Sequence, residues 1–274
     1  MPDIHNPQLE HVLCHIDELG IASLTLNRKD KSNAFDDEMI QLLIQHLRML
    51  RNEPSVKCLT IHAEGKHFSA GADLNWMKSM ADKSYSENLK DAEQLAALMN
   101  ELDTFPHPTI ALVHGCAFGG ALGLICCSDI AVATVDSTFC FSEVKLGLIP
   151  ATIGPYVCRA IGTRQARRYM LTSEHFDSTT ALQLGLIHKV VNSLHKQDEY
   201  LKELTQLILG NSPEAVRQTK ALCLRCEKDP INEELIQFTS QLIADARVSE
   251  QGQEGLHAFF EKRYPNWVST QKEH

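Results

Sequence analysis

Apolar and polar residues alternate along the chain from His11 to Leu26, on either side of the break Glu18-Leu19-Gly20. Such alternation is typical of strands with one buried face, and the glycine in the break permits a tight turn. The pattern therefore predicts two antiparallel strands joined as a hairpin.

Helical spacing follows from Asp36 to Arg51, where apolar residues recur every three or four positions. Acidic residues in the predicted first turn and Pro54 beyond the last turn are typical of helix ends. A buried strand is predicted next from Val56 to Ile61, and a long amphipathic helix from Ser86 to Leu102. These elements are expected to form one layer of helices on a sheet.

A third apolar strand, Thr109 to Val113, leads into the stretch Gly115-Cys116-Ala117-Phe118-Gly119-Gly120-Ala121-Leu122-Gly123. We interpret this stretch as a glycine-rich turn before a helix that includes residues 124–128, because small residues allow close approach of the backbone to a ligand. Further strands are predicted from Ile130 to Val135 and from Thr138 to Phe141.

Only helical patterns remain after Val191. They cover residues 196–209, 213–227, 232–248 and 250–262. A chain of 274 residues can bury one substantial core with a small appendage. The order of elements predicts an α/β core over residues 1–195 and a helical region over residues 196–274, with no internal sequence repeat.

Charge and composition narrow the classes of function. The formal net charge of -9 argues against a nucleic-acid partner, because phosphate binding needs a basic surface. No apolar stretch is long enough to predict a membrane span. Residues 1–10 lack the pattern of an export signal, so we expect a cytoplasmic protein.

The nine cysteines are interpreted as reduced, mostly buried thiols, as expected in the cytosol. Cys223 and Cys226 have the spacing of half a metal site, but no second pair has suitable spacing. No metal site is therefore predicted.

Two turns between a strand and a helix could supply amide donors. In His67-Phe68-Ser69-Ala70-Gly71-Ala72-Asp73 the Ala72 amide would lie at a helix N-terminus, where a developing anion is stabilised. The Gly119-Gly120 turn could aim a second N–H at the same oxygen, which is the geometry of an oxyanion hole. The alternatives are a plain tight connection and a phosphate loop, and the Gly-Lys-Ser/Thr ending of the latter is missing.

Glu143 follows the strand predicted from Thr138 to Phe141 and is flanked by apolar residues. Burial among such residues would raise the pKa of the carboxyl toward the range useful for proton transfer. The alternative is a surface glutamate paired with Lys145.

Together these segments resemble the crotonase, or enoyl-CoA hydratase/isomerase, family. The resemblance begins near Leu26-Asn27-Arg28, includes Ala70-Gly71-Ala72-Asp73 and the stretch 115–123, and continues past Glu143 to Phe260-Glu261-Lys262-Arg263. It implies a spiral of strand-strand-helix repeats with a C-terminal helical region used in assembly of a homotrimer, commonly a dimer of trimers.

The resemblance also implies the chemistry. Ala72 and Gly120 match the family's oxyanion-hole amides, and Glu143 matches the glutamate that handles the proton at the acyl α-carbon. The substrate would be an acyl-CoA thioester, with no separate cofactor because coenzyme A is part of the substrate. Ala70, Asp73 and Gly123 would also contact the substrate.

One position departs from the two-glutamate hydratases, in which the glycine-rich turn ends in a second glutamate that holds the attacking water. This chain has Gly123 there. The closest resemblance is to bacterial methylglutaconyl-CoA or isohexenylglutaconyl-CoA hydratases, carried by residues 68–77, 117–120, 142–144 and 149–151. It implies hydration of a branched, carboxylated enoyl-CoA such as 3-methylglutaconyl-CoA, as in leucine degradation. The alternatives are an enoyl-CoA isomerase, an acyl-CoA decarboxylase and a non-catalytic, RNA-binding relative.

Other polar and charged residues could have a structural role, a functional role or both. Arg28 and Lys262 match positions where the family often has basic residues near the phosphates of coenzyme A, but both could be solvated surface charges. Asp73 could simply cap the helix that follows. His114 is expected to be a core histidine bonded to backbone. A solvated helix face is expected for Arg164, Arg167 and Arg168.

Overall fold

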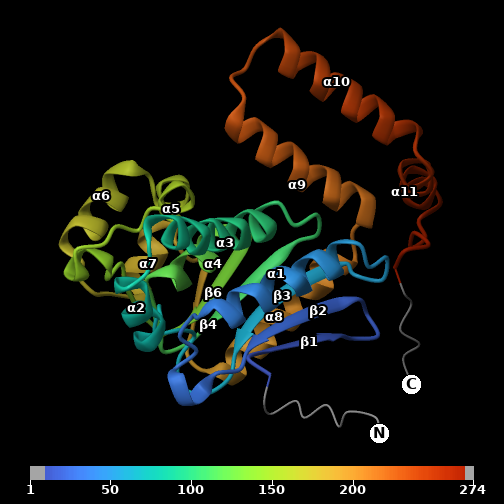
Figure 1. Cartoon of the computed structure of the whole chain (residues 1–274). Coiled ribbons are helices and arrows are strands. Elements are labelled where there is room, and N and C mark those ends of the chain that lie inside the picture. The colour runs from blue at the N-terminus through green and yellow to red at the C-terminus, as the bar shows by residue number, and fades with distance from the viewer. Residues whose placement is uncertain (1–9, 269–274) are drawn as a thin grey trace, which may run out of the picture. The chain divides into compact units, whose positions relative to one another are not determined.

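The computed structural model describes residues 10–268, which belong to two compact units (Figure 1). The first comprises residues up to Phe105 and Thr109–Tyr200, and the second comprises Pro106–Pro108 and the residues from Leu201 onward. No helix of the described part is long and apolar enough to cross a membrane.

The first unit contains a six-stranded sheet in the order β1-β2-β3-β4-β6-β9. Its strands are β1 (Val12–Ile16), β2 (Ile21–Leu26), β3 (Cys58–Ala63), β4 (Thr109–Val113), β6 (Ile130–Thr134) and β9 (Lys189–Val191). Strand β1 pairs with β2 in the antiparallel hairpin that the alternation predicts, and all other pairs are parallel. The α/β class predicted from the sequence is confirmed.

A second sheet has three short strands, β5 (Cys116–Phe118), β7 (Thr138–Cys140) and β8 (Phe176–Asp177). The sequence analysis predicted a glycine-rich turn over the stretch 115–123. The structure instead divides this stretch between a strand and the start of a helix. Its residues 116–118 form β5, and the helix that includes residues 124–127 begins at Gly120. Pairing with β7 stabilises a strand that is too short for its own pattern to reveal.

The helices of the first unit come between these strands, except the last one, which follows β9. They are α1 (Asp37–Arg51), α2 (Leu74–Ala81), α3 (Tyr85–Asp103), α4 (Gly120–Cys127), α5 (Gly154–Ile161), α6 (Thr163–Thr172), α7 (Ser178–Leu184) and the start of α8 (Leu194–Leu209). Helix α1 packs on α3 and buries one apolar face. Burial of each such side chain contributes about 1.5–3 kcal/mol to folding.

A strand-strand-helix order recurs in this unit. Strands β4 and β5 precede α4, and strands β6 and β7 precede α5, with the first strand of each pair in the large sheet and the second in the small one. The segment before α2 follows the same course, because Ser69 makes a parallel bridge with Ala117 of β5. Three successive turns of chain are thus stacked in register.

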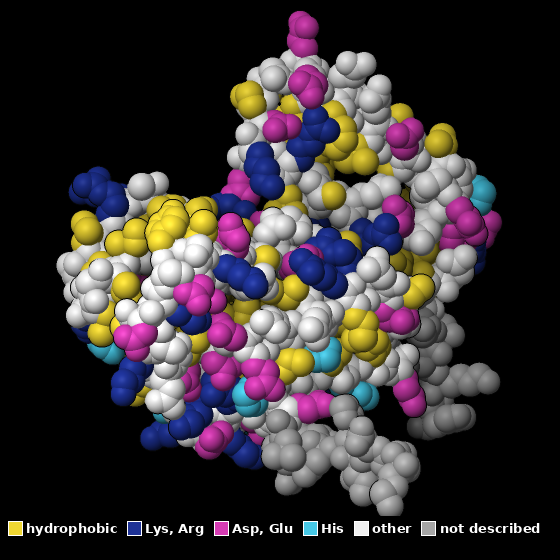
Figure 2. All heavy atoms as spheres, viewed as in Figure 1, with side chains coloured by type: hydrophobic (Ala, Val, Ile, Leu, Met, Phe, Trp, Pro, Cys, Tyr) yellow, Lys and Arg dark blue, Asp and Glu magenta, His cyan; other side chains and the backbone are white. Residues whose placement is uncertain are grey.

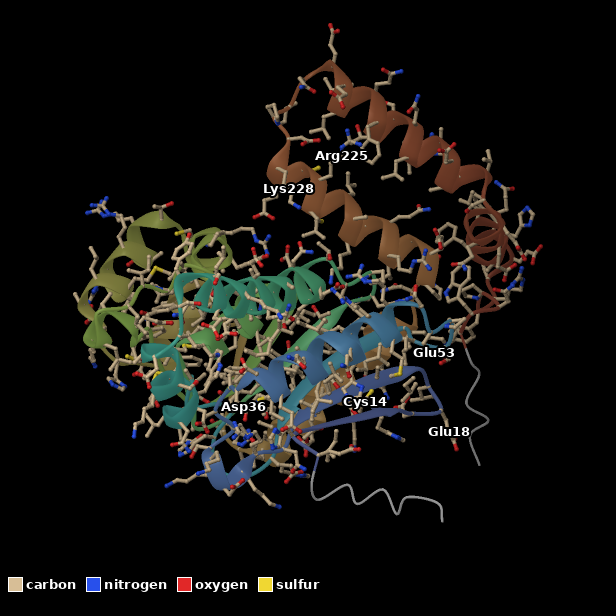
Figure 3. All side chains as sticks on the ribbon, in the orientation of Figure 1. Cys14, Glu18, Asp36, Glu53, Arg225 and Lys228 are labelled. Atoms are coloured by element: carbon tan, nitrogen blue, oxygen red, sulfur yellow. The ribbon has the colours of Figure 1, made fainter. Side chains whose placement is uncertain are left out.

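The second unit contains α9 (Pro213–Lys228), α10 (Glu233–Val248) and α11 (Glu250–Glu261), close to the predicted helices. Hydrophobic side chains lie between α9 and α10 (Figure 2). Arg225 points from α9 toward α10, where its guanidinium lies 3.9 Å from the centre of the Phe238 ring (Figure 3). The use of these helices in trimer assembly stays a prediction.

Two smaller predictions are confirmed. His114 is buried, and its Nε2 lies 3.0 Å from the backbone oxygen of Gly65, so it is a core histidine bonded to backbone. Arg164, Arg167 and Arg168 are exposed on α6. Within the described residues the nine cysteines are thiols rather than disulfides, five of them buried, while Cys223 and Cys226 are exposed.

Candidate active site

The small sheet brings together the ends of three chain segments. Its register aligns three residues, Ser69, Ala117 and Phe139. Three positions further along each segment are Ala72, Gly120 and Ser142. Because the aligned strands are parallel, these positions lie at the same edge of the sheet. A cavity of about 660 Å³ is lined by all three and by Glu143.

Ala72 is held by a parallel bridge to Phe35. The Phe35 amide donates to the Gly71 oxygen at 2.7 Å, and the Asp73 amide donates to the Phe35 oxygen at 2.8 Å. Since successive amides of an extended chain point to opposite sides, the Ala72 N–H points away from Phe35. It has no acceptor among the described residues.

Gly120 is the first residue of α4, so its N–H has no partner within the helix. The preceding Gly119 has φ 53° and ψ -125°, a conformation that favours glycine, and its amide donates to the Cys140 oxygen at 3.0 Å. This bond fixes the start of α4 against the end of β7. Within residues 10–268 the Gly120 N–H also lacks an acceptor, and the helix dipole favours an anion in front of it.

Glu143 begins a short 3-10 helix that ends at Leu146, just after β7. Its Oε1 lies 3.3 Å from the position that a Cβ on Gly119 would occupy. Its Oε2 is buried and has no hydrogen-bond partner in the described part of the chain. Burial raises the pKa of this carboxyl, as the sequence analysis expected. Lys145 is exposed, and no ion pair joins it to Glu143 among these residues.

The cavity wall is mainly apolar. Helix α2 contributes Leu74, Trp76, Met77 and Met80, and the segment after Glu143 contributes Leu146 and residues 148–153. Trp76 is fixed by its indole N–H, which donates to Asp37 of α1 at 2.7 Å. The predicted Ala70 also lines the cavity. This wall suits a hydrocarbon chain next to a few polar groups.

Some cavity residues were missed by the sequence analysis. Asn88 and Asp91 line the cavity from α3, together with Ala92 and Leu95. Their helical spacing was the available signal, but it did not show which face of α3 meets the cavity. Asp91 pairs with Lys83 at 2.5 Å. Ser142 lies in a stretch that carries the family resemblance, but no role was predicted for it.

Gly123 is separated from the cavity, although we predicted that it contacts the substrate. It lies inside α4 rather than in a turn, and it does not line the cavity. A Cβ there would be 2.5 Å from both Ile153 Cγ2 and Met99 Sδ. The place of the family's second glutamate is thus filled by two apolar side chains.

We expect Gly123→Ala to destabilise the fold by about 1–3 kcal/mol, because the added methyl group overpacks the core against Ile153 and Met99. Urea unfolding followed by circular dichroism measures the change. The same substitution made in an Ile153→Ala background should cost less than it does in the parent protein, since one of the two clashes is then absent. An unchanged midpoint for Gly123→Ala would contradict this packing.

Arg28 and Asp73 belong to one buried ion-pair network. Arg28 Nη2 lies 2.8 Å from Asp36 Oδ2 and 3.2 Å from Asp73 Oδ2. Each carboxylate caps a helix, because Asp36, at the start of α1 (Figure 3), accepts from the Met39 amide and Asp73 caps α2. The reading of Arg28 as a solvated surface charge is therefore wrong. Its proximity to coenzyme A stays a prediction.

Asp73 accepts the amides of Asn75 at 2.8 Å and Trp76 at 3.2 Å, which confirms the predicted cap. Burial opposes ionisation, but these two hydrogen bonds and Arg28 lower the pKa of Asp73 overall. Asp73 is absent from the cavity wall. Lys262 ends α11 in the second unit, so its contact with coenzyme A also stays a prediction.

The chain belongs to the enoyl-CoA hydratase/isomerase family, whose sequence profile matches residues 17–271. An enoyl-CoA hydratase from Shewanella pealeana is 51% identical, with a TM-score of 0.91 over 95% of this chain and 97% of that chain. A crotonase from Legionella pneumophila is 45% identical, with a TM-score of 0.89 over 94% of this chain and 99% of that chain. A Thermus thermophilus protein assigned as an enoyl-CoA hydratase is 31% identical over 93% of this chain and its own full length.

Proposed function

We propose that the protein adds water to the double bond of a 2-enoyl-CoA thioester. The observation that carries this proposal is the meeting of two amides without acceptors, those of Ala72 and Gly120, with a partnerless oxygen of Glu143 at one cavity. The amides can receive the thioester oxygen as it gains negative charge. The carboxylate can move a proton beside the same acyl group.

The reaction needs no other titrating group. The oxygen of water forms a bond to C3 while one of its protons passes to the Glu143 carboxylate. The electrons of the double bond move onto the thioester, and the resulting enolate oxygen accepts both N–H groups. Glu143 then returns the proton to C2, so the sum is one water added across the double bond. Burial of Glu143 favours this exchange, because it brings the pKa of the carboxyl closer to neutrality.

The cavity wall favours an uncharged acyl chain. Among residues 10–268 no Lys, Arg or His lines it, and the two ionisable lining residues, Asp91 and Glu143, are acidic. A carboxylate buried there would find no cation in the described wall and would be repelled by Glu143, while the Lys83 ammonium is already paired with Asp91. We therefore propose an apolar acyl group, and the 3-methylglutaconyl group predicted by resemblance becomes the alternative. Leucine degradation, a cytoplasmic location and a trimer or hexamer stay predictions.

A comparison of two thioesters tests the acyl group. We expect 2-hexenoyl-CoA to be hydrated with a kcat/KM at least about tenfold higher than that of 3-methylglutaconyl-CoA, because an unpaired buried charge costs more than about 1.4 kcal/mol. Loss of the conjugated enoyl absorbance measures both rates. A preference for 3-methylglutaconyl-CoA would overturn the apolar acyl group and restore the carboxylated one. Hydration of neither thioester would overturn the proposed hydration.

Double-bond isomerisation is the second candidate, and the filled position at Gly123 favours it. Asp91 at the cavity wall is paired with Lys83, so Glu143 is the carboxylate that could remove a proton from C2 of a 3-enoyl-CoA and return it to C4. A gain of conjugated absorbance from 3-hexenoyl-CoA, without hydration of 2-hexenoyl-CoA, would establish isomerisation instead. Decarboxylation and RNA binding have no comparable observation in their favour.

A further inference from the structure

Hydration requires a group that holds the attacking water in addition to the base. A water molecule in a protein cavity typically makes two to four hydrogen bonds. Glu143 can accept one of them, and Gly123 cannot carry a second carboxylate because Ile153 and Met99 fill the space. Another polar group near Glu143 must therefore complete the site if the protein is a hydratase.

Ser142 has the right position along the chain. It follows the aligned residue Phe139 by three positions, as Gly120 follows Ala117 and Ala72 follows Ser69. Its Oγ lies 3.7 Å from the position of a Cβ on Gly119, and Glu143 Oε1 lies 3.3 Å from the same point. Both oxygens thus lie within 4 Å of one point beside Gly119, and both residues line the cavity.

The Ser142 hydroxyl has no structural task that accounts for it. Ser142 precedes the short helix at Glu143, but its side chain makes no capping bond. Within the described residues it makes no other hydrogen bond, whereas the neighbouring Ser69 hydroxyl accepts the Gly71 amide at 3.2 Å. A half-buried hydroxyl at the cavity, able both to donate and to accept, is suited to bind a polar reactant.

We propose that Ser142 is a further catalytic residue, which holds the attacking water against C3. This inference rests on the proposed hydration. One O–H of the water donates to Glu143 and the other to Ser142 Oγ, so that a lone pair of the water oxygen faces C3. Ser142 gains and loses no proton, and the proton balance remains with Glu143. The hydroxyl of Ser142, just after β7, thus takes the place of the carboxylate that is missing at Gly123 in α4.

The test separates water attack from enolate formation. Exchange of the C2 proton of butyryl-CoA in D2O requires Glu143 and the two amides, but it requires no water at C3. We expect Ser142→Ala to slow hydration of 2-hexenoyl-CoA about 10- to 100-fold, because the water is no longer oriented. Exchange at C2 should remain within about threefold of the parent protein, since the amides and Glu143 are unchanged.

Two further variants complete the experiment. Ser142→Thr keeps the hydroxyl and should recover at least half of the lost hydration on a logarithmic scale. Ser240→Ala removes an exposed serine of α10 and serves as the matched control for both rates. Equal hydration by Ser142→Ala and the parent protein would overturn the role of Ser142, and so would a parallel loss of hydration and exchange. A parent protein that exchanges C2 protons but hydrates nothing would overturn the proposed function instead.

Discussion

Glu143→Gln should lower the rate of hydration of a 2-enoyl-CoA by about 1,000-fold or more. General acid–base catalysis by one group contributes about 100- to 10,000-fold, and Glu143 acts first as base and then as acid. The amide keeps the shape of the side chain but cannot carry the proton. Turnover of 2-hexenoyl-CoA measures the loss, and calorimetric binding of butyryl-CoA checks that the thioester is still bound. A rate within tenfold of the parent protein would remove Glu143 from the mechanism.

The pH profile gives a second readout for the same residue. Glu143 must be ionised to accept the proton of water, and its pKa is raised by burial above the usual glutamate value of about 4.3. Activity should therefore fall as the pH drops through this raised pKa, at a higher pH than an exposed glutamate would give. The residual activity of Glu143→Gln should lack this acid limb. An acid limb retained in the variant would assign it to another group.

Gly120→Pro should be about 100- to 1,000-fold slower than Gly120→Ala, because only the proline variant lacks the N–H that stabilises the enolate. Proline is favoured at the first position of a helix, and this amide has no partner that the fold would lose. An added Cβ would meet the Phe35 ring at 3.7 Å, which is an ordinary contact. Alanine adds the same atom and is thus the matched comparison.

Steady-state kinetics with 2-hexenoyl-CoA and urea unfolding of both Gly120 variants decide the result. Similar stabilities with a large difference in kcat would assign the effect to the missing donor. Two folded variants with equal kcat would show that the Gly120 amide does not act on the substrate. The same pair of variants should differ in exchange at C2 of butyryl-CoA, since exchange also passes through the enolate.

Long elements with a regular pattern could be predicted from the sequence. The hairpin, α1, α3 and β4 end within a few residues of their predicted positions, because each has one buried and one exposed face or a continuous buried run. Strands β8 and β9 have only two and three residues, which is too short for any period to show. Their formation depends on pairing with β7 and β6.

The site was predictable where its chemistry lies in one short stretch of sequence. Ala72, Gly120 and Glu143 each follow a strand among small or apolar residues, and all three line the cavity. The close packing around Gly123 was not predictable, because Met99 and Ile153 contact this position from segments distant in sequence. The pairing of Arg28 with Asp36 and Asp73 was hidden for the same reason, since no local pattern records a contact across 45 residues.

The proposed oxyanion hole consists of main-chain amides, so few substitutions can remove its donors. Of the twenty amino acids, only proline lacks the N–H, and codon changes at Ala72 or Gly120 to any other residue preserve both donors. The groups proposed to transfer the proton and to hold the water, Glu143 and Ser142, are ordinary side chains that a single substitution can replace. Substitutions at these two side chains can therefore alter the proposed reaction while the two main-chain donors are retained.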